Sequence, residues 1–342
     1  MTTTNATPRH SPAAFRGCLL GGAIGDALGA GVEFLSLSEI RAAHGPAGVT
    51  GYVPAYGRAG AITDDTQMTL FTAEALVRAR RDGRPAREAG HAAYLRWLAT
   101  QGDRRAAPAH DPGLLAIPAL HARRAPGATC LAALRRGRAG TRAAPLNDSK
   151  GCGGVMRVAP VGLAAATLDE AFDLGCDLAA ITHGHPTGWI AAGVLSAIVW
   201  GVVQGDTLEA AARRTRVRLV REPDHAETLA SLDAALGRAA AAGHDPTPRD
   251  VEALGGGWVA EEALGIGLFC ALVARDLPHG LLLAVNHGGD SDSTGAIAGN
   301  LLGLVHGEAA LPAAWLEALE LREVIAGAAD ELWRAFGPSS GT

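Results

Sequence analysis

Apolar positions recur with helical spacing over most of the chain. Six stretches rich in Ala, Leu and Arg have the period and residue preferences of helices: 70–81, 88–98, 169–180, 208–220, 226–241 and 261–273. A further stretch, 189–203, is apolar almost throughout but falls short of the roughly 18 residues of a membrane span, so it predicts a buried central helix. No run of alternating β-branched residues indicates a sheet, and aromatic residues make up only 4% of the chain. The pattern therefore predicts an all-α protein.

The predicted helices belong to one large multi-helix domain at 13–336. Pro- and Gly-rich breaks near 104–113, 124–127 and 243–248 bring no lasting change of composition, so they predict loops within that domain. Residues 1–12 are rich in Thr, Asn and Pro and lack the apolar core of a secretory signal, which predicts a disordered tail. Residues 337–342, rich in Gly, Pro and Ser, predict a second tail.

Two rows of glycine recur at every fourth residue, so each row lines one face of a helix. The rows are Gly17, Gly21, Gly25 and Gly29, and Gly295, Gly299, Gly303 and Gly307. An interior glycine costs a helix about 1 kcal/mol relative to alanine, so such a row needs a packing reason. We expect close approach of another backbone. The alternative is a chance product of Gly-rich composition.

Two acidic clusters, Thr63-Asp64-Asp65-Thr66 and Asp290-Ser291-Asp292-Ser293-Thr294, lie far apart in otherwise small and apolar surroundings. Short polar side chains are also ordinary helix N-caps, and each cluster precedes a helical pattern, at 67–81 and 295–307. One cap needs only one acid, however, and each cluster carries two. Gathered carboxylates need compensating positive charge, and their hard oxygen ligands suit Mg²⁺, Mn²⁺ or Ca²⁺. The clusters predict a binuclear metal site, which is compatible with capping.

Net charge indicates which classes of partner to expect, and cysteine content indicates the compartment. The net charge of −5 gives no general basic surface for nucleic acid or for an anionic membrane, although a compact nucleotide ligand stays possible. The five cysteines are scattered and show neither zinc-ligand spacing nor a disulfide frame, which favours a reducing cytoplasm. We expect a cytoplasmic monomer.

Five motifs in order resemble the ADP-ribosylglycohydrolases, a family that includes the dinitrogenase reductase-activating glycohydrolase and the ADP-ribosyl-acceptor hydrolases. The motifs are Gly25-Asp26-Ala27-Leu28-Gly29 with Glu33, Ile62-Thr63-Asp64-Asp65-Thr66, Gly151-Cys152-Gly153-Gly154-Val155-Met156-Arg157, Thr182-His183, and Gly288-Gly289-Asp290-Ser291-Asp292-Ser293. They span most of the chain, from about residue 17 to residue 307. Any one of them alone is a weak signal, whereas all five in family order are a strong one.

The resemblance implies an all-α fold around two Mg²⁺ or Mn²⁺ ions that cleaves the glycosidic bond between ADP-ribose and an acceptor. The implied metal ligands are Thr63, Asp64, Asp65, Asp290, Asp292 and Ser293. Ser293 replaces the threonine of many relatives, and Thr294 could compete for its role. The implied partner is an ADP-ribosylated protein or another ADP-ribosylated group; arginine, serine, a nucleic-acid end and a small molecule all stay open as acceptors.

Cleavage at an anomeric carbon passes through an oxocarbenium-like transition state that carboxylates stabilise while an activated water attacks. Glu33 matches an acid that relatives place near the metals, and its neighbours Val32 and Phe34 favour function over a solvent-facing glutamate. Either Glu33 or a metal-bound aspartate such as Asp292 is expected to transfer the proton.

The glycine-rich segment 147–154 suits a diphosphate, because glycines let backbone amides wrap an anion and Ser149 or Lys150 can add a donor. A plain loop between helices is the alternative. His183 matches a substrate-contacting histidine of the family, and Cys152 has no evident base that would make it a nucleophile. The predicted substrate-binding residues are Asp64, Ser149, Lys150, Gly151, Cys152, Gly153, Gly154, Val155 and His183.

Two other functions stay open. Asp290-x-Asp292 also occurs in phosphohydrolases, which place the motif after a strand, and here 281–285 is the only candidate strand. A non-catalytic structural or ADP-ribose-binding relative is the second alternative, although the chain has all of the expected acids. Release of free ADP-ribose would distinguish the glycohydrolase from the phosphohydrolase, which releases inorganic phosphate.

Overall fold

The computed structural model describes residues 10–103, 111–242 and 246–338. This part of the chain forms sixteen α-helices, four short 3₁₀ helices and two isolated β-bridges, with no strand, so the all-α prediction is confirmed. The helices are α1 (Pro12–Gly29), α2 (Leu37–His44), α3 (Asp64–Asp82), α4 (Ala86–Thr100), α5 (Ala128–Leu134), α6 (Ala159–Ala164), α7 (Leu168–Ala180), α8 (Pro186–Val203), α9 (Leu208–Leu219), α10 (Ala226–Ala241), α11 (Pro248–Glu252), α12 (Ala260–Leu272), α13 (Leu277–Val285), α14 (Ser291–His306), α15 (Ala313–Ala318) and α16 (Arg322–Phe336). The 3₁₀ helices are η2 (Gly113–Ala116), η3 (Pro118–Leu120), η4 (Cys152–Gly154) and η5 (Glu308–Ala310).

Each stretch predicted from apolar spacing lies in a helix, and the ends agree closely except where an acidic cluster begins one. Helices α3 and α14 start at Asp64 and Ser291, so the clusters form their first turns and do not merely precede them. The partial positive charge of a helix N-terminus favours acids there. Residues 1–9 and 339–342 of the predicted tails, and 104–110 and 243–245 of the predicted loops, lie outside the described residues.

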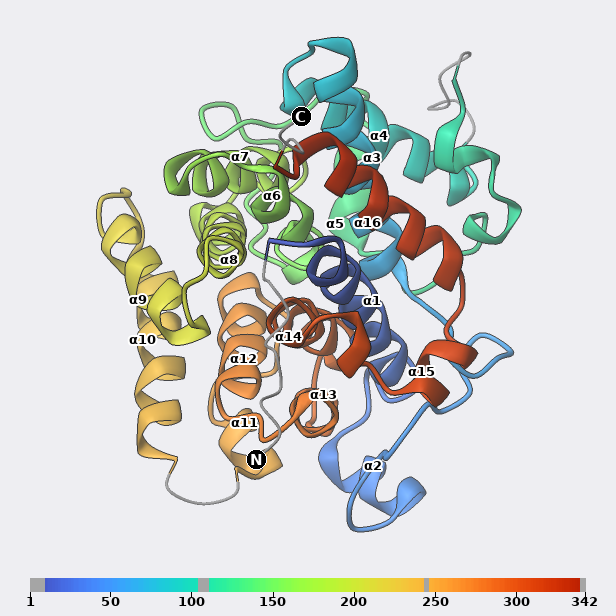
Figure 1. The fold of residues 1–342 in the computed structure, drawn as a ribbon, viewed down its shortest axis with the longest axis vertical. Helices are drawn as coiled ribbons and strands as arrows, with labels where there is room; N and C mark the ends of the chain where they lie inside the picture. Colours follow the sequence, from blue (N-terminus) through green and yellow to red (C-terminus); the bar gives the residue numbers. More distant parts are fainter. Residues whose placement is uncertain (1–9, 104–110, 243–245, 339–342) are drawn as a thin grey trace.

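The two glycine rows meet in one contact between α1 and α14, which lie side by side near the centre of the molecule (Figure 1). A Cβ atom added at Gly21 or at Gly25 would overlap the backbone of Gly299 or of Gly295. The same holds in reverse for Gly299, which faces the backbone of Gly21. The prediction of close backbone approach is therefore confirmed, because the backbone of each glycine row packs directly against that of the other.

Helix α8 lies among α6, α7, α9 and α12, which pack around it (Figure 1). Within the described ranges it is the one helix long and apolar enough to cross a membrane, but 89% of its apolar window is buried inside the protein. Buried core helices commonly have this composition. The predicted buried central helix is confirmed.

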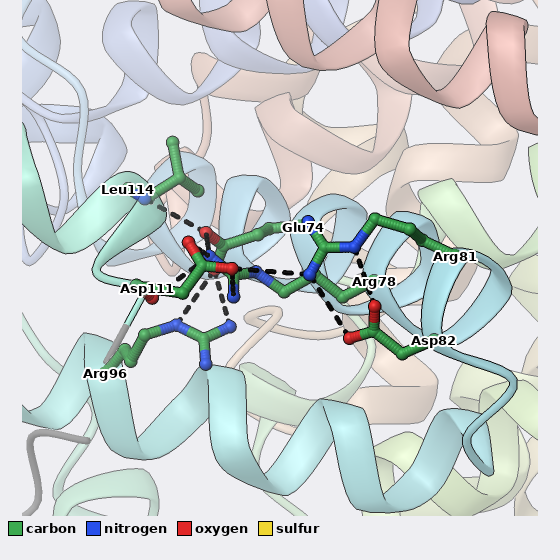
Figure 2. Close-up of polar contacts among 7 residues, drawn as sticks. All are labelled: Glu74, Arg78, Arg81, Asp82, Arg96, Asp111 and Leu114. Atoms are coloured by element: carbon green, nitrogen blue, oxygen red, sulfur yellow. Dashed lines mark hydrogen bonds and ion pairs between the residues drawn. The ribbon is translucent and has the colours of Figure 1, made fainter. Parts of the chain in front are cut away.

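Helix α3, which carries the first acidic cluster, is fixed to its neighbours by an ion-pair network centred on Glu74 (Figure 2). The Glu74 carboxylate accepts hydrogen bonds from the Arg96 guanidinium of α4 at 2.7 and 3.0 Å and from Arg78 at 3.0 Å. The amide of Leu114 in η2 donates to it at 3.0 Å. Because Glu74 and Arg96 are largely buried, this network holds α3, α4 and η2 in one arrangement.

The glycine contact generates a test of stability. Gly299→Ala places a Cβ against the backbone of Gly21, and overpacking of this kind costs about 1–3 kcal/mol or more. Gly237→Ala is the matched control, because Gly237 lies in α10 with no atom within 4 Å of the added Cβ. The control should stabilise the protein by about 0.5–1 kcal/mol. Urea unfolding of both variants measures the difference, and equal effects would contradict close packing as the reason for the row.

Candidate active site

One cavity of about 300 Å³ brings together residues from both ends of the chain. Glu33 enters from the turn after α1, Asp64 and Asp65 from the first turn of α3, and Asp290 and Asp292 from the start of α14. Other predicted residues that line it are Gly151, Cys152, Gly153, His183 and Ser293. The two acidic clusters, separated by more than 200 residues in sequence, thus face one space.

The acidic groups are close enough to share a cation. Glu33, Asp290 and Asp292 each offer a carboxylate oxygen, and these three oxygens lie within 4.8 Å of one another. In the same cavity, Glu33 Oε2 and Asp65 Oδ1 are buried without a hydrogen-bond partner among the described residues. A buried acid oxygen without a donor is costly unless a cation reaches it. The oxygen-only donor set therefore fits hard divalent cations such as Mg²⁺ or Mn²⁺.

Burial and mutual repulsion shift the proton affinity of these acids. Burial, followed by the charge of Asp292, raises the pKa of Asp26 to about 7 and that of Glu33 to about 10. Burial also raises the pKa values of Asp64, Asp65 and Asp290 well above their usual range. Without compensating positive charge, the cluster therefore holds protons at neutral pH.

Asp26 is a site residue that sequence reasoning missed. Its fully buried carboxylate accepts hydrogen bonds from the amide of Thr63 at 3.0 and 3.1 Å, and from both the amide and the hydroxyl of Thr66. Asp26 thus accepts hydrogen bonds from amides at the start of α3 that have no partner within that helix. Its carboxylate lies at the N-terminus of α3, although Asp26 itself belongs to α1. Its place inside the first glycine row, directly after Gly25, was the available signal.

Thr63 is fully buried at the N-cap of α3. Its side chain caps α3 by accepting from the Asp65 amide at 3.3 Å, and its hydroxyl lies 3.4 Å from Asp65 Oδ2. Ser293 and Thr294 are the two residues of the second cluster whose hydroxyl groups could bind a cation. Ser293 lines the cavity. Thr294 is committed elsewhere, because its hydroxyl donates to the Ala284 carbonyl at 2.8 Å.

The glycine-rich segment forms one wall of the cavity, and the side chains of Ser149 and Lys150 are bonded to other parts of the chain. Lys150 Nζ pairs with Glu261 at 2.5 Å and with Glu227 at 2.8 Å, and the Ser149 hydroxyl bonds that of Thr129 at 3.0 Å. The backbone of the segment bonds the chain around Trp258, since the Cys152 amide donates to the Trp258 carbonyl at 3.2 Å. Gly154 and Val155 are buried behind this wall.

Cys152 lies against the second acidic cluster as a neutral thiol. Its Sγ donates to Asp290 Oδ2 at 2.8 Å, and burial, followed by the charges of Asp290 and Asp65, raises the pKa of the thiol well above its usual range. Because the thiolate is the reactive form, this environment opposes a nucleophilic role.

Two exposed aromatic residues at the cavity, Phe34 and Trp258, were also not identified from the sequence. Phe34 is 69% exposed and Trp258 is 43% exposed, yet the rings stack with centroids 5.3 Å apart and planes at 21°. Phe34 holds a positive φ of 70°, a strained backbone for an aromatic residue. Both rings line the cavity, and the position of Phe34 directly after Glu33 was the signal in the sequence.

Comparison with known proteins places these features in a family. The model of the family described as ADP-ribosylglycohydrolase matches residues 7–341. The chain is 29% identical over 327 residues to an uncharacterized protein of Archaeoglobus fulgidus, covering 93% of this chain and 95% of that protein. It is 30% identical over 314 residues to the ADP-ribosyl-[dinitrogen reductase] glycohydrolase of Rhodospirillum rubrum, covering 90% of each. A solved structure described as an ADP-ribosylglycohydrolase-related protein complex gives a TM-score of 0.65 at 28% identity, covering 96% of this chain and 99% of that one.

The raised carboxyl pKa values predict how stability depends on pH when divalent cations are removed. An acid whose pKa is raised by folding stabilises the folded state below its unfolded pKa, and this contribution is lost as pH rises through the folded pKa. For Asp26 and Glu33 the folded values are about 7 and about 10. In EDTA we expect the melting temperature to fall from about pH 5 to about pH 8, and Mg²⁺ or Mn²⁺ to restore it by binding the folded state.

Asp292→Asn should flatten that pH dependence, because after burial the Asp292 charge is the largest cause that raises the pKa values of Asp26, Glu33 and Asp65. It should also reduce the gain in melting temperature on adding Mg²⁺. Glu317→Gln, an equal loss of charge at an exposed position on α15, is the control and should leave both unchanged. A full Mg²⁺ response in Asp292→Asn would contradict Asp292 as a ligand.

Proposed function

The chain belongs to the ADP-ribosylglycohydrolase family, and we propose that it is a divalent-cation-dependent hydrolase that cleaves the glycosidic bond between ADP-ribose and an acceptor. The family match and the named relative support hydrolysis of ADP-ribose linkages. One observation carries the finer proposal: a single cavity joins the buried acids of α3 and α14 to Glu33 and to the glycine wall.

Six residues would hold the two proposed cations: Thr63, Asp64, Asp65, Asp290, Asp292 and Ser293. When bound, Mg²⁺ or Mn²⁺ would neutralise the acids, orient the ribose hydroxyls and lower the pKa of a water molecule. The chain itself already orients several ligands. The Gly127 amide donates to Asp64 Oδ2 at 3.1 Å, and the Ser293 amide donates to Asp292 Oδ1 at 2.9 Å.

Glu33 is the group we propose for proton transfer. Burial and the charges of Asp292 and Asp290 raise its pKa to about 10, so without a cation it is protonated at neutral pH and can act as an acid. A bound cation would lower this pKa toward neutral pH. Its Oε2 is buried without a hydrogen-bond partner among the described residues, whereas Asp292 Oδ1 is held by the Ser293 amide. Glu33 therefore has the less committed carboxyl group of the two candidates.

The partner we propose is an ADP-ribosylated protein or another ADP-ribosylated group, with the acceptor left to experiment. We also propose a cytoplasmic location, which the five free cysteines support because disulfides are rare in a reducing compartment. A monomer is proposed as well.

The phosphohydrolase alternative loses its structural premise. Residues 281–285, the only candidate strand before the Asp290-x-Asp292 motif, lie within helix α13, and the motif begins α14. The described part of the chain has no strand that could carry that motif in the phosphohydrolase manner.

A substrate panel tests the reaction. Peptides ADP-ribosylated on arginine or serine, and an ADP-ribosylated nucleic-acid end, are incubated with the protein in Mg²⁺, Mn²⁺ or EDTA, and the products are separated by chromatography. We expect free ADP-ribose with one acceptor class, and none in EDTA. Release of inorganic phosphate would instead support a phosphohydrolase. No product from any acceptor would support a non-catalytic relative.

Glu33→Gln tests the proton-transfer role. The change keeps the size of the side chain and removes its titration, so turnover should fall about 10²–10⁴-fold, the usual contribution of general acid–base catalysis. The affinity for ADP-ribose, measured by calorimetry with Mg²⁺, should change far less. A near-wild-type rate would exclude the role, and a parallel loss of Mg²⁺ affinity would make Glu33 a ligand.

Gly153→Val tests the glycine wall. A Cβ at Gly153 would lie 3.0 Å from Cys130 Sγ and 3.1 Å from His183 Cε1, so a branched side chain must extend into the cavity or displace its wall. ADP-ribose affinity should fall, with a smaller effect on Mg²⁺ affinity. Gly151→Ala is the milder control, because its Cβ would meet atoms no closer than 3.5 Å. Unchanged ADP-ribose affinity in Gly153→Val would identify the segment as a plain loop.

A further inference from the structure

Arg157 is a buried cation without a carboxylate partner among the described residues. Its guanidinium lies over the Tyr94 ring, 4.2 Å from the centroid, and donates to the Leu178 carbonyl at 3.2 Å. Its shortest polar contact is with the hydroxyl of Thr182, to which it donates at 2.8 Å. It also donates to the sulfurs of Cys130 and Met68 at 3.4 Å. Burial of an arginine is costly, and among these partners the Thr182 hydroxyl is the one that also contacts His183.

The Thr182 hydroxyl has one proton, and the local contacts decide where it goes. Arg157 can only donate, so it uses a lone pair of the hydroxyl oxygen. Three acceptors lie around it: His183 Nδ1 at 2.9 Å, the Ala179 carbonyl at 3.4 Å, and the Cys130 sulfur, which is a weak acceptor and already accepts from Arg157 at 3.4 Å. That carbonyl already accepts from the amides of Thr182 at 3.1 Å and His183 at 3.0 Å, which fills its two lone pairs. Thr182 therefore donates to His183 Nδ1.

The charge of Arg157 favours the same arrangement. A cation on the Nδ1 side of the imidazole attracts a lone pair there and repels an N–H group. Burial, together with the Arg157 charge, lowers the pKa of His183 to about 3, so the ring is neutral. Its one proton is then on Nε2. This nitrogen faces the glycine wall, since a Cβ at Gly151 or at Gly153 would lie 3.6 or 3.4 Å from it.

We propose that Arg157 and Thr182 are positioning residues that fix His183 in its Nε2–H tautomer, so that it donates a hydrogen bond to an acceptor oxygen of the ligand in the cavity. Only the identity of that ligand, ADP-ribose, rests on the proposed function. The relay itself, from the Arg157 guanidinium through the Thr182 hydroxyl to the His183 ring, is a property of the ligand-free protein.

Nitrogen NMR of the protein labelled with ¹⁵N-histidine reads the tautomer directly. The His183 signals are assigned by their loss in His183→Gln. We expect an unprotonated Nδ1 and a protonated Nε2 in the wild type and in Thr182→Ser, which keeps the hydroxyl. In Thr182→Val, which removes it, we expect the Nδ1–H form to appear. A wild-type ring protonated on Nδ1, or on both nitrogens, would overturn the proposal without any substrate.

Binding of ADP-ribose in Mg²⁺, measured by calorimetry, tests the consequence. Thr182→Val should weaken it about threefold to tenfold, the usual range for one hydrogen bond, and Thr182→Ser should stay within about twofold of wild type. Thr215→Val is the matched control, because Thr215 is fully buried on α9 with an unpartnered hydroxyl, and it should leave affinity unchanged. Unchanged affinity in Thr182→Val would overturn the positioning role. Absence of ADP-ribose binding in the wild type would contradict the proposed function, while the NMR result still decides the relay.

Discussion

The active-site geometry depends on the contact between the glycine faces of α1 and α14. At the end of that contact, a Cβ on Gly29 would overlap the backbone of Ser291 and Asp292. Glu33 follows Gly29 by one helical turn, so the same contact that lets two backbones touch also sets the distance from Glu33 to the second acidic cluster. Interiors resist small changes in volume because they are close-packed. A larger side chain in either row would separate the two helices and move Glu33 away from the second acidic cluster.

The electrostatic constraint follows from that packing. Helices α3 and α14 direct their N-terminal ends at one cavity, and a helix N-terminus stabilises an acid by about 0.3–1 kcal/mol. This is too little to keep several buried carboxylates charged together, as the raised pKa values of Asp64, Asp65 and Asp290 indicate. The protein supplies part of the compensation through helix ends and backbone amides. Cations are the remaining source of positive charge that the oxygen-only donor set suits.

The helices and the gathering of the two acidic clusters could be predicted from sequence, because periodic apolar spacing and interleaved acids are local signals. Contacts between side chains that are distant in the sequence could not be predicted, because the tertiary fold decides them. Lys150 is predicted to help bind a diphosphate, and its pairing with Glu227 and Glu261, which are 77 and 111 residues away, could not be foreseen. The stacked pair of Phe34 and Trp258 likewise joins distant turns. Nothing in the sequence near a lysine or an exposed ring identifies a partner that the fold brings in from another helix.

The start of α3 shows how far the support of the site extends beyond the acids themselves. Glu320, just before α16, accepts from the Ile62 amide at 3.2 Å and pairs with Arg124 at 3.1 Å. The Arg124 carbonyl in turn accepts from the Asp64 amide at 3.0 Å. Together with Asp26, these contacts place the first acidic cluster from three separate parts of the chain. None of the supporting groups lines the cavity. A substitution at Glu320 would act on the site by moving α3, and one at Asp26 would also remove a charge that raises the pKa values of Glu33, Asp64 and Asp65. A motif search confined to the acidic clusters would overlook both positions.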